Sequence, residues 1–598
     1  MSSRIPQGPP LASEALPFTP ARVGSWNHWI EVHPNRVALA LVALGLGLRL
    51  ATAWGTYLNP DEALHFFIAD RASLVAAYQA NLTMAHPPLM ILVLCGWRSL
   101  GTSELWLRLP SILAGTAFCW IYFRWLTRLF GRNVALAGLT LAALLPPLVS
   151  LTAEVRQYGL LLVFLIGGAY LLECATAENS PRLMLGSGAC FWLALGSHYS
   201  AFLFVAVMGI YSPLRFRGSR ISRPTLTAWM AGELGALVLG VTLYLTHIAQ
   251  IRHTTMAEQA FDDWLRKSYF HRGHDNRLIF LVTRSFSFFQ YLFGQLVVGD
   301  VLALLFIAGI VLLLRAQAET REAERWRSRF AVLLIFPFLL NYGAALFDLY
   351  PYGGTRHCVY LAIFALAAVS LAIIKMTGEN ALRGIAFSLL LVALCLLFRT
   401  NHLPMIARAD QKLEEIDRAV QFLREQLPQT DSILADYESG IMLGHYLCEK
   451  KPISYEGSIP GFLVLHCGGH RIISTDHDLW AFTPPTFLSA WRHLVEAGYF
   501  NTGDTVWVAQ VGWMVELDDE LRKGLPEFRD LRTQAFGHNI RFFPLRVGSA
   551  MPPASQSLRI TPAMAAGLSD RVWNQIVLMA DTYMPMPRPR RPYKQRVP

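Results

Sequence analysis

Long apolar segments recur through the first 400 positions of this chain. Each spans about 20 residues with almost no charge, which is the length that an α-helix needs to cross the hydrocarbon core of a bilayer. The pattern predicts a membrane α-helical protein with about 11 transmembrane helices. The run at 88–100 is short for a span, and we expect it to lie along the membrane surface. The expected spans are 36–56, 107–124, 134–151, 159–172, 183–195, 201–211, 225–248, 292–314, 331–347, 359–374 and 386–398.

The pattern changes after about residue 405, where charged positions return. It predicts a charged helix at 411–426, a strand at 432–437 and a helix that ends at Leu447. Short segments rich in β-branched and aromatic residues predict further strands, and this alternation is typical of a small α/β domain. These later strands are expected at 471–474, 505–510 and 539–545.

The chain therefore divides into four parts. A polar, Pro-rich segment at 1–35 precedes a transmembrane domain at 36–400, and the α/β domain occupies 405–583. The last stretch, 584–598, is rich in Pro and Arg and is predicted to be disordered.

Composition and charge support this division and indicate how the chain is oriented. The sequence is 53% hydrophobic and 16% charged, well below the quarter or so that is usual for a soluble protein. Its net charge is +10, but the basic residues gather in short loops between apolar runs, which favours membrane orientation over nucleic-acid binding. With the Arg-rich loops inside, we expect a multi-pass protein of the cell membrane whose N-terminus is cytoplasmic and whose α/β domain is external.

The first external loop carries two adjacent carboxylates, Asp61 and Glu62, directly after the first span. One interpretation is structural, because Asn59 and Pro60 make a strong helix start and acids are favourable in a first turn. The other is chemical, because acids at a membrane edge suit a reaction on a substrate that lies partly in lipid. An amphipathic helix is expected at about 61–80, and the loop ends at His86-Pro-Pro.

Other polar residues fall at outer ends of the predicted spans, and each has a structural alternative such as an interfacial anchor. Glu154 and Tyr158 are expected on one helical face, with Arg156 pointing elsewhere. The pair Gly353-Gly354 precedes Arg356, where the backbone can approach a ligand closely and where arginine suits a phosphate. Together these residues predict a site on the outer face; the others are Arg49 within the first span, Arg108, His86, His198 and His357.

These motifs, in this order, resemble those of bacterial GT-C glycosyltransferases, the group of the protein O-mannosyltransferases and lipid A aminoarabinose transferases. The resemblance covers roughly 36–398, and two positions depart from the family pattern. Arg356-His357 stands where Arg-Tyr is frequent, and His86 stands where the aminoarabinose transferases have Lys. The motifs are Arg49, Asp61-Glu-Ala, His86-Pro-Pro-Leu, Arg108-Leu-Pro-Ser, Glu154-Val-Arg-Gln-Tyr158 and Thr355-Arg-His357.

The resemblance implies a fold, a reaction and roles for these residues. It implies a GT-C membrane domain that moves a sugar, with inversion, from a polyprenyl-phosphate donor to a lipid, glycan or protein acceptor. Asp61 is implied as base with Glu62 beside it. The residues implied at the donor phosphate are Arg156, Arg356, His86 and Tyr158, supported by Arg49, Arg108, Glu154, His198 and His357.

The sequence also bears on other functions, on cofactors and on disulfides. A transporter or flippase would show two repeated halves with broken helices, and a scaffold would leave the Asp-Glu loop unexplained. The spacing requires no cofactor and matches no metal motif, although a divalent metal is compatible with the resemblance. Cys448 and Cys467 lie in the expected external domain and can pair there. The six other cysteines lie in or beside apolar segments and are expected to be small core residues.

Overall fold

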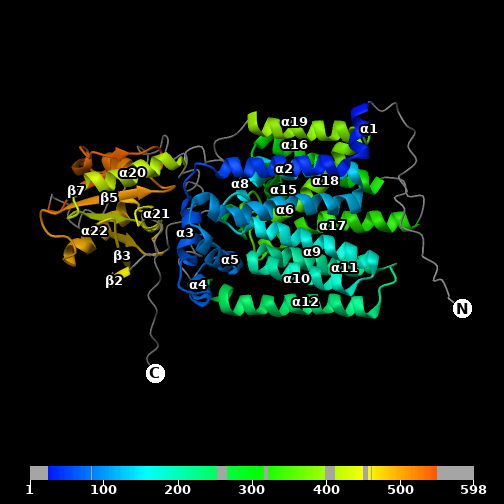
Figure 1. The fold of residues 1–598 in the computed structure, drawn as a ribbon, viewed down its shortest axis with the longest axis horizontal. Coiled ribbons are helices and arrows are strands. Elements are labelled where there is room, and N and C mark those ends of the chain that lie inside the picture. The colour runs from blue at the N-terminus through cyan, green and yellow to red at the C-terminus, as the bar shows by residue number, and fades with distance from the viewer. Residues whose placement is uncertain are drawn as a thin grey trace, which may run out of the picture. The chain divides into compact units, whose positions relative to one another are not determined.

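The computed structural model describes residues 25–82, 84–217, 219–251, 265–315, 321–397, 411–448, 455–459, 461–477 and 479–548. The chain forms two compact units. The helical unit comprises residues 1–56, 68–250 and 268–409, and the α/β unit comprises 57–67, 251–267 and 410–598 (Figure 1). The first 24 residues of the predicted N-terminal segment and the predicted disordered tail lie outside the described residues.

The helical unit is a bundle of helices (Figure 1). Its α-helices are α1 (Ser25–Val32), α2 (Pro34–Ala53), α4 (Leu74–Asn81), α5 (Leu89–Trp97), α6 (Glu104–Phe130), α7 (Arg132–Leu144), α8 (Pro146–Leu151), α9 (Tyr158–Glu178), α10 (Pro181–Ser197), α11 (Ser200–Phe216), α12 (Arg223–Leu243), α15 (Arg277–Phe293), α16 (Leu296–Arg315), α17 (Arg321–Leu346), α18 (Ala362–Met376) and α19 (Ala381–Leu397). Short helical turns are η1 (Arg98–Leu100), the π-helical η2 (Tyr244–Ile248), the three-residue α13 (Ala249–Ile251), η4 (Arg266–Ser268) and η5 (Arg356–Leu361).

Among the described residues, 7 helices are long and apolar enough to cross a membrane, and the protein is a multi-pass membrane protein. Four shorter apolar helices of 10–17 residues accompany them, and the count of about 11 spans stays a prediction. The long helices are Pro34–Ala53, Glu104–Phe130, Tyr158–Glu178, Arg223–Ile251, Leu296–Arg315, Ser328–Leu346 and Arg356–Met376; the shorter ones are Leu89–Leu100, Arg132–Leu144, Ser200–Phe216 and Ala381–Leu397.

The most deeply buried helix is α18, whose sequence is apolar on every side. Residues 362–374 are all buried, and α18 packs against α7, α16, α17 and α19. A helix without a polar face can be covered only by other helices or lipid, which explains its central position. By contrast, α12 exposes Leu234, Leu237 and Val238 at 62%, 64% and 58%, which is the surface expected to face lipid.

Three predicted elements are divided differently in the structure. The helix expected at 61–80 is two helices, because α3 (Pro60–Ala69) ends before Ser73, which caps α4 by accepting a bond from the Ala76 N–H at 3.2 Å. The span expected at 134–151 breaks at Leu145, since the Pro146 that follows disfavours a helical conformation there.

The third difference concerns the loop expected at 252–284. Residues 252–264 lie outside the described part, but α15 already begins at Arg277. Asn276 caps it, because its side-chain oxygen accepts from the N–H groups of Leu278 at 2.9 Å and Ile279 at 3.2 Å. The polar residues before Arg277 led to the prediction of a loop, although Asn276 among them is the N-cap of α15.

Arg49 is fully buried inside the bundle and connects several helices. Its guanidinium donates to the Thr152 hydroxyl at 2.8 Å and to the carbonyls of Gly45 at 3.0 Å and Ala143 at 3.1 Å. It also donates to the Cys119 sulfur at 3.7 Å. These partners belong to α2, α6, α7 and the end of α8, so Arg49 orients helices in the structure.

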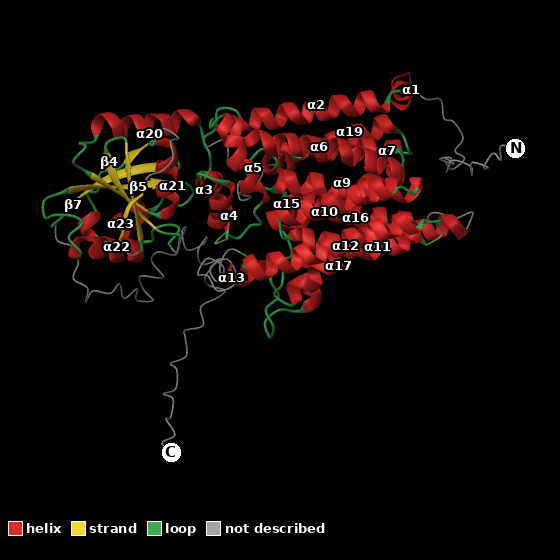
Figure 2. Ribbon diagram, turned by 60° about the horizontal axis from the view of Figure 1, so that its bottom comes forward, coloured by secondary structure: helices red, strands yellow, loops and turns green. Residues whose placement is uncertain are grey.

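The α/β unit is built on a seven-stranded sheet (Figure 2). The strand order is β2-β3-β4-β1-β5-β7-β6, and β1 is parallel to both β4 and β5 while the other pairs are antiparallel. The register pairs Ile433 with Ile472 on one side and with Trp507 on the other. The strands are β1 (Ser432–Ala435), β2 (Tyr455–Ile459), β3 (Phe462–Cys467), β4 (His470–Thr475), β5 (Thr505–Val511), β6 (Gln534–Ala535) and β7 (Ile540–Arg546).

The helices of this unit complete the α/β architecture that the sequence predicted. They are α3, α20 (Leu413–Gln426), α21 (Tyr437–Tyr446), α22 (Pro484–Glu496), α23 (Leu517–Gly524) and the short η7 (Pro526–Phe528). The predicted helix at 411–426 is confirmed as α20, and the four predicted strands correspond to β1, β4, β5 and β7. The strand expected to reach Tyr437 ends earlier, because Asp436 caps α21 by accepting from the Ser439 N–H at 2.9 Å.

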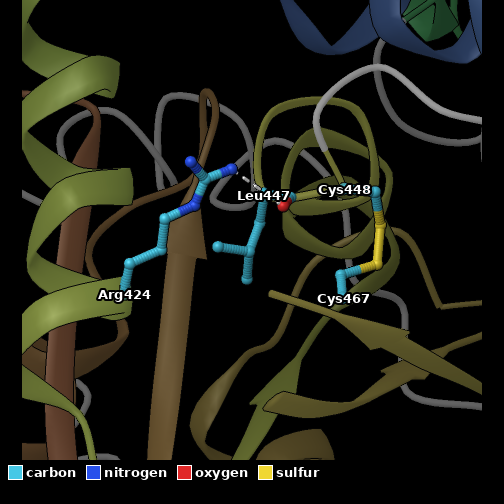
Figure 3. The surroundings of a disulfide bond; sticks show 4 residues. All are labelled: Arg424, Leu447, Cys448 and Cys467. Atoms are coloured by element: carbon cyan, nitrogen blue, oxygen red, sulfur yellow. Dashed lines mark hydrogen bonds between the residues drawn. A yellow bond between two sulfur atoms is a disulfide. The ribbon is translucent and has the colours of Figure 1, made fainter. Parts of the chain in front are cut away.

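A disulfide joins Cys448 and Cys467, the two cysteines that the sequence left as a candidate pair (Figure 3). Their Cα atoms are 4.8 Å apart. Beside the bond, Arg424 of α20 donates to the Leu447 carbonyl at 3.3 Å. The disulfide thus fixes the end of α21 to strand β3.

Arg49 provides a test of how this bundle is held. We expect Arg49→Lys to lower the yield and the unfolding temperature of the purified protein more than its rate per folded molecule. Lysine keeps the charge but loses the planar set of donors, and each buried acceptor left unsatisfied costs roughly 1–3 kcal/mol. The control is Arg36→Lys at an exposed position of α2. An unchanged unfolding temperature with a large loss of rate would contradict the structural role.

Candidate functional site

Six of the predicted site residues gather in the helical unit. We call them the Arg–His cluster, which consists of Arg156, Tyr158, His86, His198, His357 and Arg356. The cluster forms where short connections between helices meet, and it has His198 at its centre. The residues come from the segment before α5, the start of α9, the turn between α10 and α11, and η5.

Three histidine rings are layered in this cluster. The His198 ring lies 6.0 Å from the His86 ring and 5.7 Å from the His357 ring, measured between centroids, with interplanar angles of 25° and 26°. The Tyr158 ring is 5.4 Å from His198, and the Arg156 guanidinium lies over the Tyr158 ring at 5.8 Å. The three histidine rings, the Tyr158 ring and the Arg156 guanidinium are therefore packed closely together.

His198 is buried and neutral at pH 7. Burial lowers its pKa well below the usual value, and the positive charges of His357, Arg156 and Arg356 act in the same direction. Its Nδ1 accepts from the Ser200 N–H at 3.2 Å and lies 2.9 Å from the Ser200 hydroxyl. A neutral imidazole that accepts at Nδ1 carries its proton on Nε2, so Nε2 is a hydrogen-bond donor.

The Tyr158 hydroxyl is the clearest sign of a ligand. The side chain is 0% exposed, and within the described part of the chain its hydroxyl has no hydrogen-bond partner. Buried polar groups are nearly always hydrogen-bonded, so such a hydroxyl needs an explanation. A polar group of a bound substrate would supply the partner.

The local backbone determines how Arg156 is presented. The sequence pattern placed Glu154 and Tyr158 on one helical face, but residues 152–157 are a chain of turns and bends and α9 starts only at Tyr158. Arg156 consequently packs over Tyr158 instead of pointing away from it, so that part of the prediction was wrong. The Ser111 hydroxyl of α6 holds the turn by donating to the Arg156 carbonyl at 2.8 Å.

A glycine-rich turn presents Arg356 and His357. Gly353 has a φ of +131°, which side chains rarely adopt, and a Cβ on Gly354 would lie 2.5 Å from the Ser287 hydroxyl. The Gly354 N–H donates to that hydroxyl at 3.0 Å. The turn therefore needs glycine at both positions, which explains the pair seen in the sequence.

Two residues of this region were missed by the sequence analysis. Ser200 bonds to His198, and the Tyr350 hydroxyl donates to the His357 carbonyl at 3.2 Å. Ser200 stands two positions after His198, a spacing at which a hydroxyl can reach a neighbouring side chain. Nothing in the local sequence distinguishes Tyr350 from other interfacial tyrosines.

Arg108 is bonded to the end of α2 and supports the structure there. It is 0% exposed and donates to the carbonyls of Ala53 at 2.9 Å and Thr56 at 3.0 Å. It also donates to the Thr56 hydroxyl at 2.8 Å. These oxygens follow the last turn of α2, so Arg108 satisfies carbonyls that a helix end leaves open.

The two predicted acids lie in the α/β unit and have different environments. Asn59 and Glu62 form a reciprocal cap at the start of α3. The Glu62 N–H donates to the Asn59 side chain at 2.9 Å, and the Asn59 N–H donates to the Glu62 carboxylate at 3.0 Å. Glu62 is 0% exposed, whereas Asp61 is half-buried. The capping role therefore falls to Glu62, and the Asp61 carboxylate is not needed for it.

The loop that carries Asp61 packs on α21 within the same unit. The Leu58 N–H donates to the Tyr446 hydroxyl at 2.7 Å, and the Tyr57 N–H donates to the Gln411 carbonyl at 3.1 Å. The Phe66 and His445 rings are 4.7 Å apart. These contacts fix the loop to the helix that follows the central strand β1.

A second, unpredicted pair of acids lies at the carboxyl end of β1. Burial raises the pKa of Asp436 to about 6. Burial, the adjacent Asp436 and the more distant Asp61 raise the pKa of Glu438 to about 8, against the N–H of Trp513. Glu438 therefore holds a proton at neutral pH, and it is close enough to Asp61 for the two carboxyl groups to interact electrostatically. Asp436 and Glu438 follow the carboxyl end of β1, whose two parallel neighbours lie on opposite sides of it. Ligands of open α/β sheets bind at this end of the strands.

The described residues do not fit a metal site. Among them, no group of three His, Cys, Asp or Glu side chains could hold a metal ion. The three histidines of the Arg–His cluster stack face to face, which does not direct their nitrogens at one point.

Comparison with known proteins was informative for the centre of the chain. Residues 85–244 match the family model described as dolichyl-phosphate-mannose-protein mannosyltransferase. The matched segment includes His86, Arg156, Tyr158 and His198, which form the larger part of the Arg–His cluster. Over this segment, about a quarter of the chain, the sequence is similar to that mannosyltransferase family. The resemblance predicted from the motifs is thereby confirmed. No curated protein matched the sequence.

Several solved structures show some likeness to this chain. ArnT from Cupriavidus metallidurans bound to undecaprenyl phosphate is 12% identical, with 86% of this chain and 99% of that chain covered and a TM-score of 0.49. The Archaeoglobus fulgidus oligosaccharyltransferase is 11% identical, with 70% and 64% covered and a TM-score of 0.43. The Pmt1-Pmt2 complex of S. cerevisiae is 18% identical, with 36% and 34% covered and a TM-score of 0.29. The chain thus spans less than two thirds of the length of the archaeal enzyme.

The raised pKa of Glu438 makes the stability of the α/β unit depend on pH. In the folded state Glu438 keeps a proton up to about pH 8, whereas in the unfolded state it releases the proton near pH 4.5. The contribution of this proton to the stability of the α/β unit is therefore complete below about pH 4.5 and is lost as the pH rises through about 8. We expect the unfolding temperature to fall between pH 6 and pH 9, and to fall less in Glu438→Gln. The full difference corresponds to a few kcal/mol at most, at about 1.4 kcal/mol per pKa unit.

Thermal unfolding followed by tryptophan fluorescence is the measurement. Glu425→Gln is the matched control, because Glu425 is exposed on α20 of the same unit. An equal fall in wild type and Glu438→Gln would exclude Glu438 as the source.

Proposed function

We propose that this protein is a glycosyltransferase that moves a sugar from a polyprenyl-phosphate donor to an acceptor hydroxyl or amine at the outer surface of the membrane. The bond from the anomeric carbon to the phosphate oxygen breaks while the acceptor atom bonds to the same carbon from the opposite face. The proton of the acceptor passes to Asp61, and the polyprenyl phosphate leaves with the electron pair. The configuration of the sugar is inverted.

The Arg–His cluster carries this proposal, and the Tyr158 hydroxyl is its decisive member. That hydroxyl is buried and lacks a hydrogen-bond partner within the described residues, beside Arg156 and the neutral His198. Donors fixed in a dry site stabilise a group on which negative charge builds up, because they need no reorganisation during the reaction. A departing lipid phosphate is such a group, and arginine is suited to bind it by two bonds.

Asp61 is assigned as base on chemical grounds. A hydroxyl acceptor is too weakly acidic to attack unaided and requires a group that takes its proton. Glu62 is used by the helix cap and buried, whereas Asp61 is half-buried at the start of α3. Glu438 keeps its proton at neutral pH and so adds no negative charge near Asp61.

Charge and the disulfide support an external position for the proposed site. The Arg-rich loops face the cytoplasm by the positive-inside rule, which places the Arg–His cluster and the α/β unit outside. The Cys448–Cys467 disulfide supports this placement of the α/β unit, because such bonds persist in oxidising compartments. A transporter remains the alternative class, but the glycosyltransferase family match disfavours it.

Asp61→Asn tests the base. We expect transfer to fall by at least ~100-fold, the lower end of what a general base contributes, with unchanged expression and unfolding temperature. Asparagine has nearly the same shape, and the cap of α3 is made by Asn59 and Glu62. Glu62→Gln should lose less activity, because glutamine also completes such a cap.

Transfer is measured by mass spectrometry of glycolipids and glycoproteins from deletion cells that are complemented with each variant. Normal turnover in Asp61→Asn would contradict the assignment of Asp61 as the base.

The phosphate clamp is tested with Arg156→Ala and Arg356→Ala. A charge-assisted contact in a dry site is worth roughly 2–4 kcal/mol, so each loss should slow turnover by about 30- to 1000-fold. Lysine at either position should restore the rate only in part, since it lacks the two-pronged geometry. Arg182→Ala, at an exposed position of α10, is the control.

Rate and donor affinity are measured in purified, folded protein. If both alanine variants keep near-normal values, the donor phosphate binds elsewhere. The next candidates are then the basic residues around the start of α15, of which Arg266, Lys267, Arg272, Arg277 and Arg284 are described.

A further inference from the structure

A cavity of about 370 Å³ lies in the helical unit, away from the Arg–His cluster. It is formed where α2 and α7 begin and where α6 ends. The polar residues that line it are Arg124, Arg128, Arg132, Asn35, Thr127 and Tyr170, and no carboxylate is among its described lining residues.

The cavity and the Arg–His cluster lie at opposite ends of the same helices. Tyr158 of the cluster is the first residue of α9, while Tyr170, which lines the cavity, is twelve residues further along the same helix. At 1.5 Å per residue this separates the two by about 18 Å along the helix axis. Figure 1 shows α2 and α6 running side by side, with α1 at the end where α2 begins. The cavity therefore cannot be part of the candidate transfer site.

Charge and backbone in the cavity both favour an anion. Arg124, Arg128 and Arg132 are all exposed at the cavity, and Arg124 also forms a hydrogen bond with the Tyr170 hydroxyl. The helices α2 and α7 are 20 and 13 residues long, and neither has a side-chain cap hydrogen bond at its start. The partial positive charge of two helix N-termini thus adds to three formal charges.

The surroundings favour a lipid over a soluble anion. Val32 lines the cavity and is 54% exposed, and Leu39 on α2 is 55% exposed. An apolar surface therefore adjoins the arginines, as a ligand with an acyl chain requires. Basic pockets at the ends of transmembrane helices on the cytoplasmic side are suited to anionic headgroups.

We propose that this cavity is a binding site for a phosphate group, supplied by the headgroup of an anionic phospholipid. The arginines hold the phosphate oxygens by charge-assisted bonds, and the acyl chains lie along the exposed apolar face of α2. The lipid takes no part in sugar transfer. It fixes the start of α2 to the end of α6 at the membrane surface opposite the candidate site.

The test compares two double variants of the full chain that remove the same charge. Arg128→Gln with Arg132→Gln removes two arginines of the cavity. The matched control is Arg182→Gln with Arg223→Gln, which removes two exposed arginines at the starts of α10 and α12, outside the cavity. Glutamine is a good helix former, so both should fold, which circular dichroism checks. Arg124→Gln is a second, milder variant of the cavity.

Binding is measured on detergent-purified protein by native mass spectrometry and by the shift of the unfolding temperature. The probes are phosphatidylglycerol, phosphatidylcholine and inorganic phosphate. We expect phosphatidylglycerol alone to bind and to raise the unfolding temperature. The cavity variant should need roughly 10- to 30-fold more of it, at about 1 kcal/mol per arginine, and the control variant less than about threefold more.

The outcomes separate the alternatives. Equal weakening in both double variants would mean attraction to general surface charge and would overturn the site. If inorganic phosphate produces the whole temperature shift, the ligand is a soluble phosphate and the lipid assignment fails. Because the candidate transfer site is at the other end of the helices, loss of lipid binding with retained transfer supports this proposal, whatever the outcome of the Arg156 and Arg356 variants.

Discussion

A guanidinium buried among membrane helices must have its N–H groups satisfied, since each unpaired donor in a water-free interior is expensive. Arg49 and Arg108 meet this requirement with the backbone carbonyls and hydroxyls of neighbouring helices. The same bonds hold α2 against α6, α7 and α8. They also determine where α2 ends and therefore the residue at which the chain leaves the helical unit for the Asp61 loop. The packing of α2 against these helices depends on this constraint.

The Arg–His cluster uses the same residue type for a different purpose. Burial, the nearby His357 and the two arginines lower the pKa of His198, and it stays neutral. The result is a set of hydrogen-bond donors and cations in a region of low dielectric, where electrostatic interactions are stronger than in water. Such an environment suits a group that becomes more negative during the reaction. The neutral Nε2–H of His198 can donate a bond without adding a charge that would have to be balanced in the free enzyme.

Arginines at the other end of the bundle are exposed and lie around a cavity. The number of these arginines is what is usual for cytoplasmic loops, whose basic residues orient a membrane protein without binding a specific ligand. Their convergence on one cavity, with two uncapped helix starts and no acid among the described lining residues, distinguishes them. Arginines at the two ends of α6 therefore have different roles, because their surroundings differ.

The sequence by itself determined the class of the protein, because long apolar runs can only be spans and because alternating strands and helices build an α/β unit. It also determined the family resemblance and named every member of the Arg–His cluster. The residues Arg49 and Arg108 were found, but their helix-holding roles required the tertiary structure, because a sequence shows a buried charge and not its partners.

Only the tertiary structure separated Asp61 from Glu62, since both stand in the first turn of α3 and only one reaches the Asn59 N–H. The turns before α9 likewise decided where Arg156 points, because the sequence there is compatible with a helix. Glu438 and the arginine cavity were invisible in the sequence for the same physical reason. A raised pKa and a cavity both arise from segments that are distant along the chain and adjacent in space.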